Sequence, residues 1–238
     1  MAHGIRSFSA GPVPVLAIFL LIALALLLIP LLVLGVIGTA FTRLGLSWVA
    51  ALALVLLMLA GSFVNIPLYR IQRDVIRATH LDSAGNERAG PFTARPVWEV
   101  VISINAGGGI IPVCIAAYLV YQAVMVTGTT ILIPLATCAA LVLIISFVST
   151  REVAGAGIRV PVIIPALTAL LAGILLTGGT GLTAAVTALA GGTIGTLAGG
   201  NLAHLGRVRE LEVPEVSIGG FGTFGAVFLC CILPALIA

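Results

Sequence analysis

Long apolar runs separated by short polar segments dominate the hydrophobic pattern of this chain. Each of these runs approaches the roughly 20 apolar residues that a helix needs to cross a bilayer. The pattern therefore predicts an all-α, polytopic membrane bundle of seven transmembrane helices, built by a single domain over residues 1–238. The predicted spans are 12–38, 44–64, 100–126, 130–149, 160–177, 181–203 and 218–238.

The composition agrees with this prediction and excludes several classes of protein. Hydrophobic residues make up 61% of the chain and charged residues only 8%, against about 25% charged residues in soluble domains. So few charged residues cannot form the polar surface of a soluble enzyme or the basic face of a nucleic-acid-binding protein, and both classes are excluded. We therefore expect a multi-pass protein of the cell membrane with membrane lipids as partners and no nucleic acid.

The charged residues predict the orientation of the bundle. All 11 cationic residues are arginines. If seven spans alternate, all but one of these arginines fall on one side, at the N-terminus and in the segments 65–99, 150–159 and 204–217. Only Arg43 falls on the other side, and all 8 acids lie on the arginine-rich side. The positive-inside rule then predicts a cytoplasmic N-terminus.

The segment 65–99 is the longest polar stretch between the predicted spans. Arg70, Arg73 and Arg77 recur at helical spacing, which favours a basic helix lying at the membrane surface. Turn-forming residues between 82 and 91, with β-branched residues around them, favour a small cytoplasmic hairpin instead. The sequence leaves both alternatives open.

Two predicted spans contain glycine-rich stretches that are unfavourable in a continuous helix. The third span has three glycines between Asn105 and Pro112, so we expect it to be broken or kinked there, with backbone amides available to water or a polar group. The seventh span opens with SIGGFGTFG, from Ser217 to Gly225. This stretch either unwinds or packs closely as a helix, and close packing is favoured. Broken membrane helices often form substrate or ion sites in transporters.

The sixth span is rich in glycine, alanine and threonine. Gly191, Gly195 and Gly199 recur every four residues, a spacing that lets helix backbones approach closely in a membrane. We therefore expect this helix at the centre of the bundle. We also expect it to approach the third span closely at Gly108.

Amide and glycine residues from several spans are predicted at one depth in the cytoplasmic half of the membrane. At a rise of about 1.5 Å per residue, Asn105 lies roughly 9 Å from Glu99, and Asn201 roughly 9 Å from Arg207. Buried amides are costly in lipid and are often functional. We therefore expect them to line a cytoplasm-facing cavity for a small solute or a lipid. The candidate binding residues are Asn65, Asn105, Gly107, Gly108, Gly109, Asn201, His204, Ser217, Gly219, Gly220 and Thr223.

The sequence carries no motif that is typical of an enzyme, a metal site or a cofactor site. No acid lies inside a predicted span, and no nucleophilic-serine, zinc-protease or nucleotide-binding pattern is present. We therefore expect no catalytic residues, no metal and no cofactor. Four cysteines without metal-ligand spacing are interpreted as buried apolar residues: Cys114, Cys138, Cys230 and Cys231.

Four sequence segments are distinctive: NIPL at 65–68, INAGGGIIP at 104–112, GTIGTLAGGNL ending at Leu202, and SIGGFGTFGAVFL at 217–229. Together they resemble an uncharacterised prokaryotic membrane family known as domain of unknown function 1614. The resemblance covers about residues 60–238, and it implies a shared membrane fold without an established activity.

The resemblance also implies that relatives carry aspartate at the positions of Asn201 and Gly225. Two aspartates inside a membrane would be similar to the site of intramembrane aspartyl proteases, in which paired carboxylates share a proton and activate water. This chain lacks both carboxylates. We therefore expect no hydrolysis by that chemistry.

Three functions stay open on the sequence. The first is a small-solute permease or lipid-handling protein with a cytoplasm-facing cavity. The second is a non-catalytic relative of the intramembrane aspartyl proteases. The third is an accessory subunit whose small-residue faces bind other membrane subunits.

Overall fold

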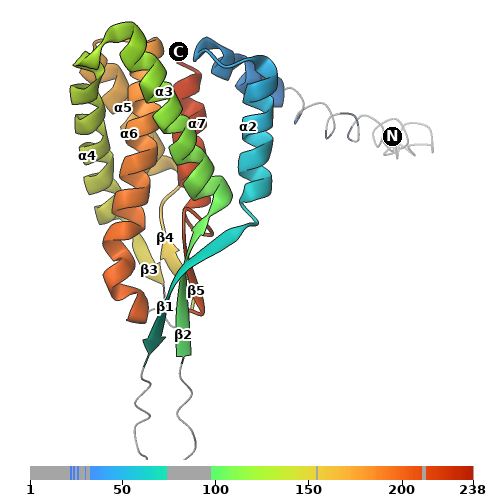
Figure 1. Cartoon of the computed structure of the whole chain (residues 1–238), viewed down its shortest axis with the longest axis vertical. Coiled ribbons are helices and arrows are strands. Elements are labelled where there is room, and N and C mark those ends of the chain that lie inside the picture. Colours follow the sequence, from blue (N-terminus) through green and yellow to red (C-terminus); the bar gives the residue numbers. More distant parts are fainter. Residues whose placement is uncertain are drawn as a thin grey trace, which may run out of the picture.

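Helices lie side by side in an elongated bundle, and short strands gather at one end of it (Figure 1). The computed structural model describes residues 33–73, 98–153, 155–210 and 213–237, together with four isolated positions between 22 and 30. The helices labelled in Figure 1 are α2 (Trp48–Gly61), α3 (Ile111–Thr127), α4 (Leu132–Ser149), α5 (Ile163–Thr177), α6 (Leu182–Gly200) and α7 (Phe224–Ala235).

Four further helical segments lie within residues 33–210 of the described chain. A helix over Val33–Arg43 precedes α2. The π-helix η1 (Ala106–Ile110) leads directly into α3, and the short 3-10 helix η2 (Thr129–Ile131) leads into α4. The 3-10 helix η3 (Leu202–Glu210) follows α6.

Three helices in the described part of the chain are long and apolar enough to cross a membrane: Ala106–Thr127, Thr129–Ser149 and Leu182–Val208. The helix Val33–Arg43 and α2 meet at 119° and would make a fourth if they count as one broken span. The apolar helices α5 and α7 are shorter. The count of seven spans and their orientation stay predictions, and most of the first predicted span, 12–38, lies outside the described residues.

The all-helical expectation is wrong at one end of the bundle, where five strands form within the described part of the chain. Strands β1 (Asn65–Arg73) and β2 (Trp98–Asn105) pair in antiparallel fashion, and β5 (Glu215–Ile218) pairs parallel to β2. Strands β3 (Arg151–Val153) and β4 (Gly157–Arg159) form a separate two-stranded ladder.

The basic helix that was one alternative for the segment 65–99 does not form over residues 65–73, because these residues are β1. The pairing of β1 with β2 is the one that a hairpin requires. Residues 74–97, with Arg77 among them, lie outside the described residues.

The third predicted span begins as a strand and becomes helical only at residue 106. Residues 100–104 are mostly β-branched, which favours an extended backbone, and a short apolar run of this kind does not distinguish a strand from a buried helix. The chain departs from α-helical geometry between Asn105 and Pro112 because η1 lies there. The predicted departure from α-helical geometry is therefore present, but η1 and α3 form one continuous helix over Ala106–Thr127 and not a broken one.

The seventh predicted span also begins later than expected. β5 is followed by a turn, and α7 starts only at Phe224. Gly219 and Gly222 have φ angles of 73° and 91°, which glycine adopts readily and other residues do not. The favoured interpretation of this stretch as a closely packed helix is wrong, because the stretch unwinds.

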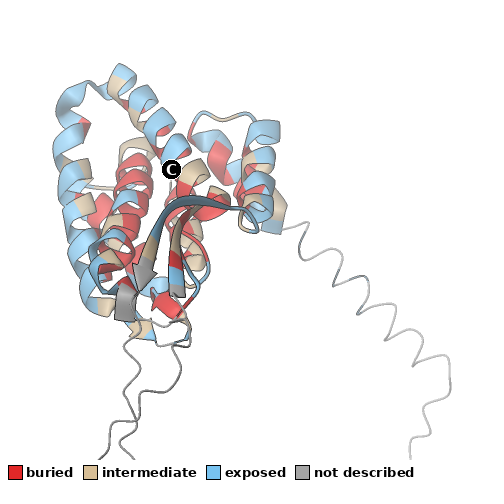
Figure 2. Ribbon diagram, turned by 60° about the horizontal axis from the view of Figure 1, so that its bottom comes forward, coloured by how far each residue is buried: buried red, intermediate tan, exposed pale blue. Residues whose placement is uncertain are grey.

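Helix α6 occupies the centre of the bundle, as its small residues predict (Figure 2). A Cβ atom at Gly191 would contact Cys138, one at Gly195 would lie 2.6 Å from the carbonyl oxygen of Ala139, and one at Gly199 would overlap α4. The stripe of glycines therefore faces α4 and lets the two backbones pack directly against each other.

The two ends of the bundle differ in charge. The strand end carries Arg70, Arg151, Arg159 and Arg207 on β1, β3, β4 and η3. The described arginine at the opposite end is Arg43, which lies near the end of α3 and the start of α6. The predicted alternation of spans also places Arg43 on the opposite side of the membrane from these four arginines.

The first testable prediction concerns the contact between α4 and α6. Replacing Gly199 with alanine would make a methyl group overlap the Leu143 carbonyl oxygen, so we expect the free energy of unfolding to fall by about 3 kcal/mol. The matched control is Gly206→Ala, because a Cβ at Gly206 has no neighbour within 4 Å. Denaturation of both variants in mixed micelles measures the difference, and equal stability of the two would contradict this packing.

Candidate functional site

The candidate residues cluster where two strands end and two helices begin. β2 leads into η1 and α3, and β5 leads through a turn into α7. The parallel register pairs Ser103 with Ser217 and Ile104 with Ile218. The two chain segments therefore leave the sheet side by side and bring their helix starts together.

Asn105 ends β2 and caps the helical segment that follows. Its Oδ1 accepts a hydrogen bond from the Gly108 N–H at 2.8 Å. Its Nδ2 donates to the Ser62 carbonyl oxygen at 2.8 Å and to Asn65 Oδ1 at 2.9 Å. The residue is only 1% exposed, so one buried amide group connects the end of α2 with β1 and the start of η1. The Gly108 amide, which was expected to be available to water or a polar group, is bonded to a polar side chain of the protein itself.

Asn65 extends this network to the surface. It pairs directly with Asn105 in the register of β1 and β2, and its Oδ1 also accepts a hydrogen bond from Ser217 Oγ at 2.8 Å. Asn65 is exposed, whereas Asn105 is buried. One side-chain oxygen of Asn65 therefore links the surface of the protein to the buried start of η1.

Direct backbone contacts replace side chains at the glycines of η1. A Cβ at Gly108 would overlap the carbonyl oxygen of Gly219, and one at Gly107 would overlap the end of α2. A Cβ at Gly109 would lie 2.7 Å from the Ile104 side chain. The expectation that Gly108 approaches the sixth span is wrong. Its close neighbour is Gly219, in the unwound turn before α7.

A second buried amide holds that turn. Asn201 follows α6 directly, and its Oδ1 accepts a hydrogen bond from the Gly219 N–H at 3.2 Å. Its Nδ2 donates to Thr223 Oγ1 at 3.0 Å. The Gly220 N–H donates to the Ser217 carbonyl oxygen at 3.2 Å and tightens the same turn. Asn201 thus anchors the segment before α7 as Asn105 anchors the segment before α3.

His204 belongs to a different contact. Its Nδ1 lies 2.7 Å from Glu152 Oε1 and its Nε2 lies 3.3 Å from the Phe147 carbonyl oxygen. Arg207 Nη1 lies 3.5 Å from the same Glu152 oxygen. Because a carboxylate and a carbonyl group both accept, the ring makes both bonds at once when both of its nitrogens carry protons. This cluster ties η3 to β3 and to the end of α4.

A cavity of about 130 Å³ opens at the strand end of the bundle. Asn65 and Ser217 are the two candidate residues that line it. The Glu215 carboxyl group adds charge, and the exposed Phe221 ring lies 5.5 Å from the Arg159 guanidinium carbon. The other lining residues are Ala156, Gly157, Ile158 and Val216. The remaining candidate residues lie deeper in the hydrogen-bonded network or in the His204 cluster.

Sequence reasoning missed several participants. Ser103 Oγ donates to Glu215 Oε1 at 2.5 Å across the pair of parallel strands, and Glu152 binds His204. The rarity of acids was the one signal that could have drawn attention to both glutamates. Nothing in the sequence indicates which residues they contact.

A family model described as "Protein of unknown function (DUF1614)" matches residues 59–237. The chain belongs to this family. The match confirms the resemblance that the four segments predicted and covers both strand-to-helix junctions. No curated protein and no solved structure gives a significant match to the chain.

The two positions at which the resemblance implies aspartate have different surroundings here. Asn201 faces Gly219 and Thr223, whereas a Cβ at Gly225 would lie 3.2 Å from the Val162 side chain. An aspartate at position 201 would keep both hydrogen bonds of Asn201, because the Thr223 hydroxyl group can reverse and donate.

The second testable prediction distinguishes the contribution of the Asn105 side chain on β2 from that of the Asn65 side chain on β1. Asn105→Asp removes both N–H donors and sets a carboxylate against two oxygen acceptors, so we expect a loss of about 3 kcal/mol in unfolding free energy. In Asn65→Asp the carboxylate still accepts from Asn105 and Ser217, so the expected change is about 0.5 kcal/mol or less. Denaturation in mixed micelles measures both, and losses of equal size would show that the Asn105 network is not as described.

Proposed function

We propose that this protein is a multi-pass permease of the cell membrane for a small polar solute, and that the cavity beside Asn65 is its solute-binding site. The observation that carries the proposal is the double role of Asn65. The residue lines the cavity, and its Oδ1 also accepts from Asn105, which caps the start of η1 and α3.

A bound solute would act on the helix starts through this oxygen. A solute that hydrogen-bonds to Asn65 or Ser217 competes with the bond between them, which is 2.8 Å long. Asn65 is in turn bonded to Asn105, and Asn105 to Gly108, which contacts Gly219. A short chain of contacts therefore runs from the cavity to the junction between the two discontinuous segments, and a ligand shifts such an equilibrium by its different affinity for the two states.

Discontinuous segments at membrane depth support transport in preference to a purely structural role. Transporters use broken helices because their free ends bind solutes and their breaks serve as hinges. In this protein the two strand-to-helix junctions meet through glycine backbones that have no side chains between them. A contact of this kind can separate without the repacking of large side chains.

The lining residues indicate the class of solute. The Glu215 carboxylate accepts hydrogen bonds, and Asn65 and Ser217 both donate and accept. The cavity volume of about 130 Å³ suits a molecule of a few non-hydrogen atoms. We therefore propose a small neutral or cationic solute that carries hydrogen-bond donors, taken up without a catalytic step, a metal or a cofactor.

The third testable prediction is made for proteoliposomes that contain the full chain. Urea, glycerol and ethanolamine serve as probes, and stopped-flow light scattering measures their uptake. At least one probe is expected to enter faster than in protein-free liposomes. Ala156→Trp, at the cavity, is expected to slow this uptake about tenfold, the effect of raising a barrier by about 1.4 kcal/mol.

The matched control is Ala203→Trp, because Ala203 is exposed at the same end of the bundle. This variant is expected to transport like the wild type. Uptake that Ala156→Trp leaves unchanged would contradict entry through this cavity. Absence of uptake for all three probes would contradict the permease and would favour the accessory-subunit function.

A further inference from the structure

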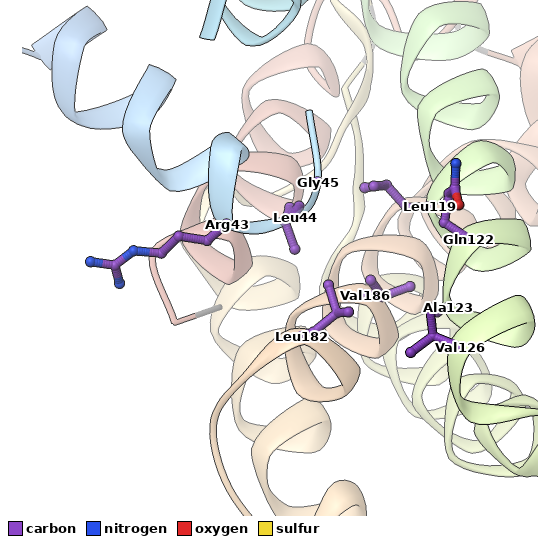
Figure 3. Close-up of a pocket in the computed structure, with 9 residues that line it drawn as sticks. All are labelled: Arg43, Leu44, Gly45, Leu119, Gln122, Ala123, Val126, Leu182 and Val186. Carbon is purple, nitrogen blue, oxygen red and sulfur yellow. The ribbon is translucent and has the colours of Figure 1, made fainter. Parts of the chain in front are cut away.

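The cavities at the two ends of the bundle differ in the charge that they present to a ligand. The larger one, of about 220 Å³, lies between the end of helix Val33–Arg43, α3 and α6. Figure 3 shows apolar side chains such as Leu119 and Val186 at this cavity, whereas the Arg43 side chain extends away from them. The cavity at the strand end, by contrast, is lined by a charged residue, Glu215.

Glu215 is the acid whose charge is left uncompensated. The structure describes the side chains of three acidic residues, all of them glutamates. Glu99 forms an ion pair with Arg70, and Glu152 forms one with Arg207. Glu215 forms no ion pair with any described residue. The acid that lines the cavity is therefore the one that can attract a cationic ligand.

A buried serine holds this carboxyl group in one orientation. Ser103 Oγ donates to Glu215 Oε1 at 2.5 Å, and Ser103 is only 1% exposed. The hydroxyl group is neutral, so the bond orients the carboxylate without removing its charge. A side chain that is already oriented loses less conformational freedom when a ligand binds to it.

The polar side chains of β5 at this cavity are arranged to accept hydrogen bonds. Glu215 and Ser217 are two residues apart on the strand and share one face of it. A carboxylate only accepts. Ser217 donates its hydroxyl hydrogen to Asn65 Oδ1, so its oxygen can only accept while that bond is intact. An ammonium group, which has three donors and no acceptor, matches this pair in both charge and hydrogen bonding.

The nearby Arg159 does not neutralise this site. Its guanidinium carbon lies 5.5 Å from the centre of the Phe221 ring, and it forms no ion pair with Glu215. Arg159 is exposed and is not a lining residue of the cavity. Water therefore screens its charge, whereas a ligand in the cavity contacts Glu215 directly.

We propose that the strand-end cavity selects a small primary ammonium compound, whose charged group binds the Glu215 carboxylate. Ser103 is the positioning residue for that carboxylate. The inference rests on the proposed function in taking this cavity as the solute-binding site, and it narrows the solute from neutral or cationic to cationic.

The test measures binding without transport, by saturation-transfer NMR titration of the full chain in detergent micelles at neutral pH. Ethanolamine, which is protonated at this pH, is compared with ethylene glycol, a neutral compound of the same size. The wild type is expected to bind ethanolamine about tenfold more tightly, the effect of one charge-assisted hydrogen bond. Glu215→Gln is expected to remove this preference.

The matched control is Glu99→Gln, which removes the same charge at the same end of the bundle. Glu99 pairs with Arg70 and does not line the cavity, so this variant is expected to keep the full preference for ethanolamine.

Ser103→Ala tests the positioning role. The variant keeps the carboxylate but frees its orientation, so we expect ethanolamine to bind about threefold more weakly. Binding of ethylene glycol is expected to stay unchanged, whereas a general structural defect would weaken the binding of both compounds. Unchanged binding of ethanolamine would contradict the role of Ser103.

The outcomes separate this inference from the permease. Absence of binding, equal affinity of the wild type for both compounds, or a preference that survives Glu215→Gln would overturn the inference. Cation-selective binding without uptake into proteoliposomes would contradict the permease and support the inference. Uptake of a neutral probe by a protein that shows no preference for ethanolamine would contradict the inference alone.

Discussion

Backbone that departs from α-helical geometry where the strands meet the apolar helices is the constraint on which this structure depends. Peptide groups that leave α-helical geometry away from water must find other partners, because each unsatisfied group costs several kcal/mol in lipid. The chain meets this requirement at two places with two asparagines. The side-chain oxygen of Asn105 accepts a hydrogen bond from the Gly108 N–H, and that of Asn201 accepts one from the Gly219 N–H. The glycines then let the two segments touch backbone to backbone, and the starts of α3 and α7 are fixed against each other.

The same constraint connects architecture with the proposed function. The amides that satisfy the breaks are reached from the surface through Asn65, which also lines the strand-end cavity. Helix α6 contributes its C-cap Asn201 to this junction, whereas its packing against α4 depends on a separate set of glycines. The bundle combines a close-packed centre with a junction held by a few hydrogen bonds.

The sequence predicted the apolar helices well and the strand-to-helix junctions poorly. α4, α5 and α6 lie within their predicted windows because their apolar runs contain no competing signal. The run at 100–105 was assigned to a helix, because a short β-branched segment that continues into a helix forms one apolar stretch. Most of β5 was assigned to the polar segment 204–217. Asn105 and Asn201 could be found as polar residues in apolar surroundings. The bond between Ser103 and Glu215 joins residues 112 positions apart and depends on a parallel register that no local pattern encodes.

Amide hydrogen exchange at Gly108 and Gly219, resolved by NMR in lipid nanodiscs, tests the central claim most directly. Both amides lie outside α-helices, yet each donates to a buried asparagine oxygen. We predict that they exchange as slowly as the Leu189 amide in the buried middle of α6, because exchange from such sites requires the junction to open. Exchange as rapid as that of the exposed turn residue Gly155 would contradict the account, because the two segments would then not be held together by these bonds.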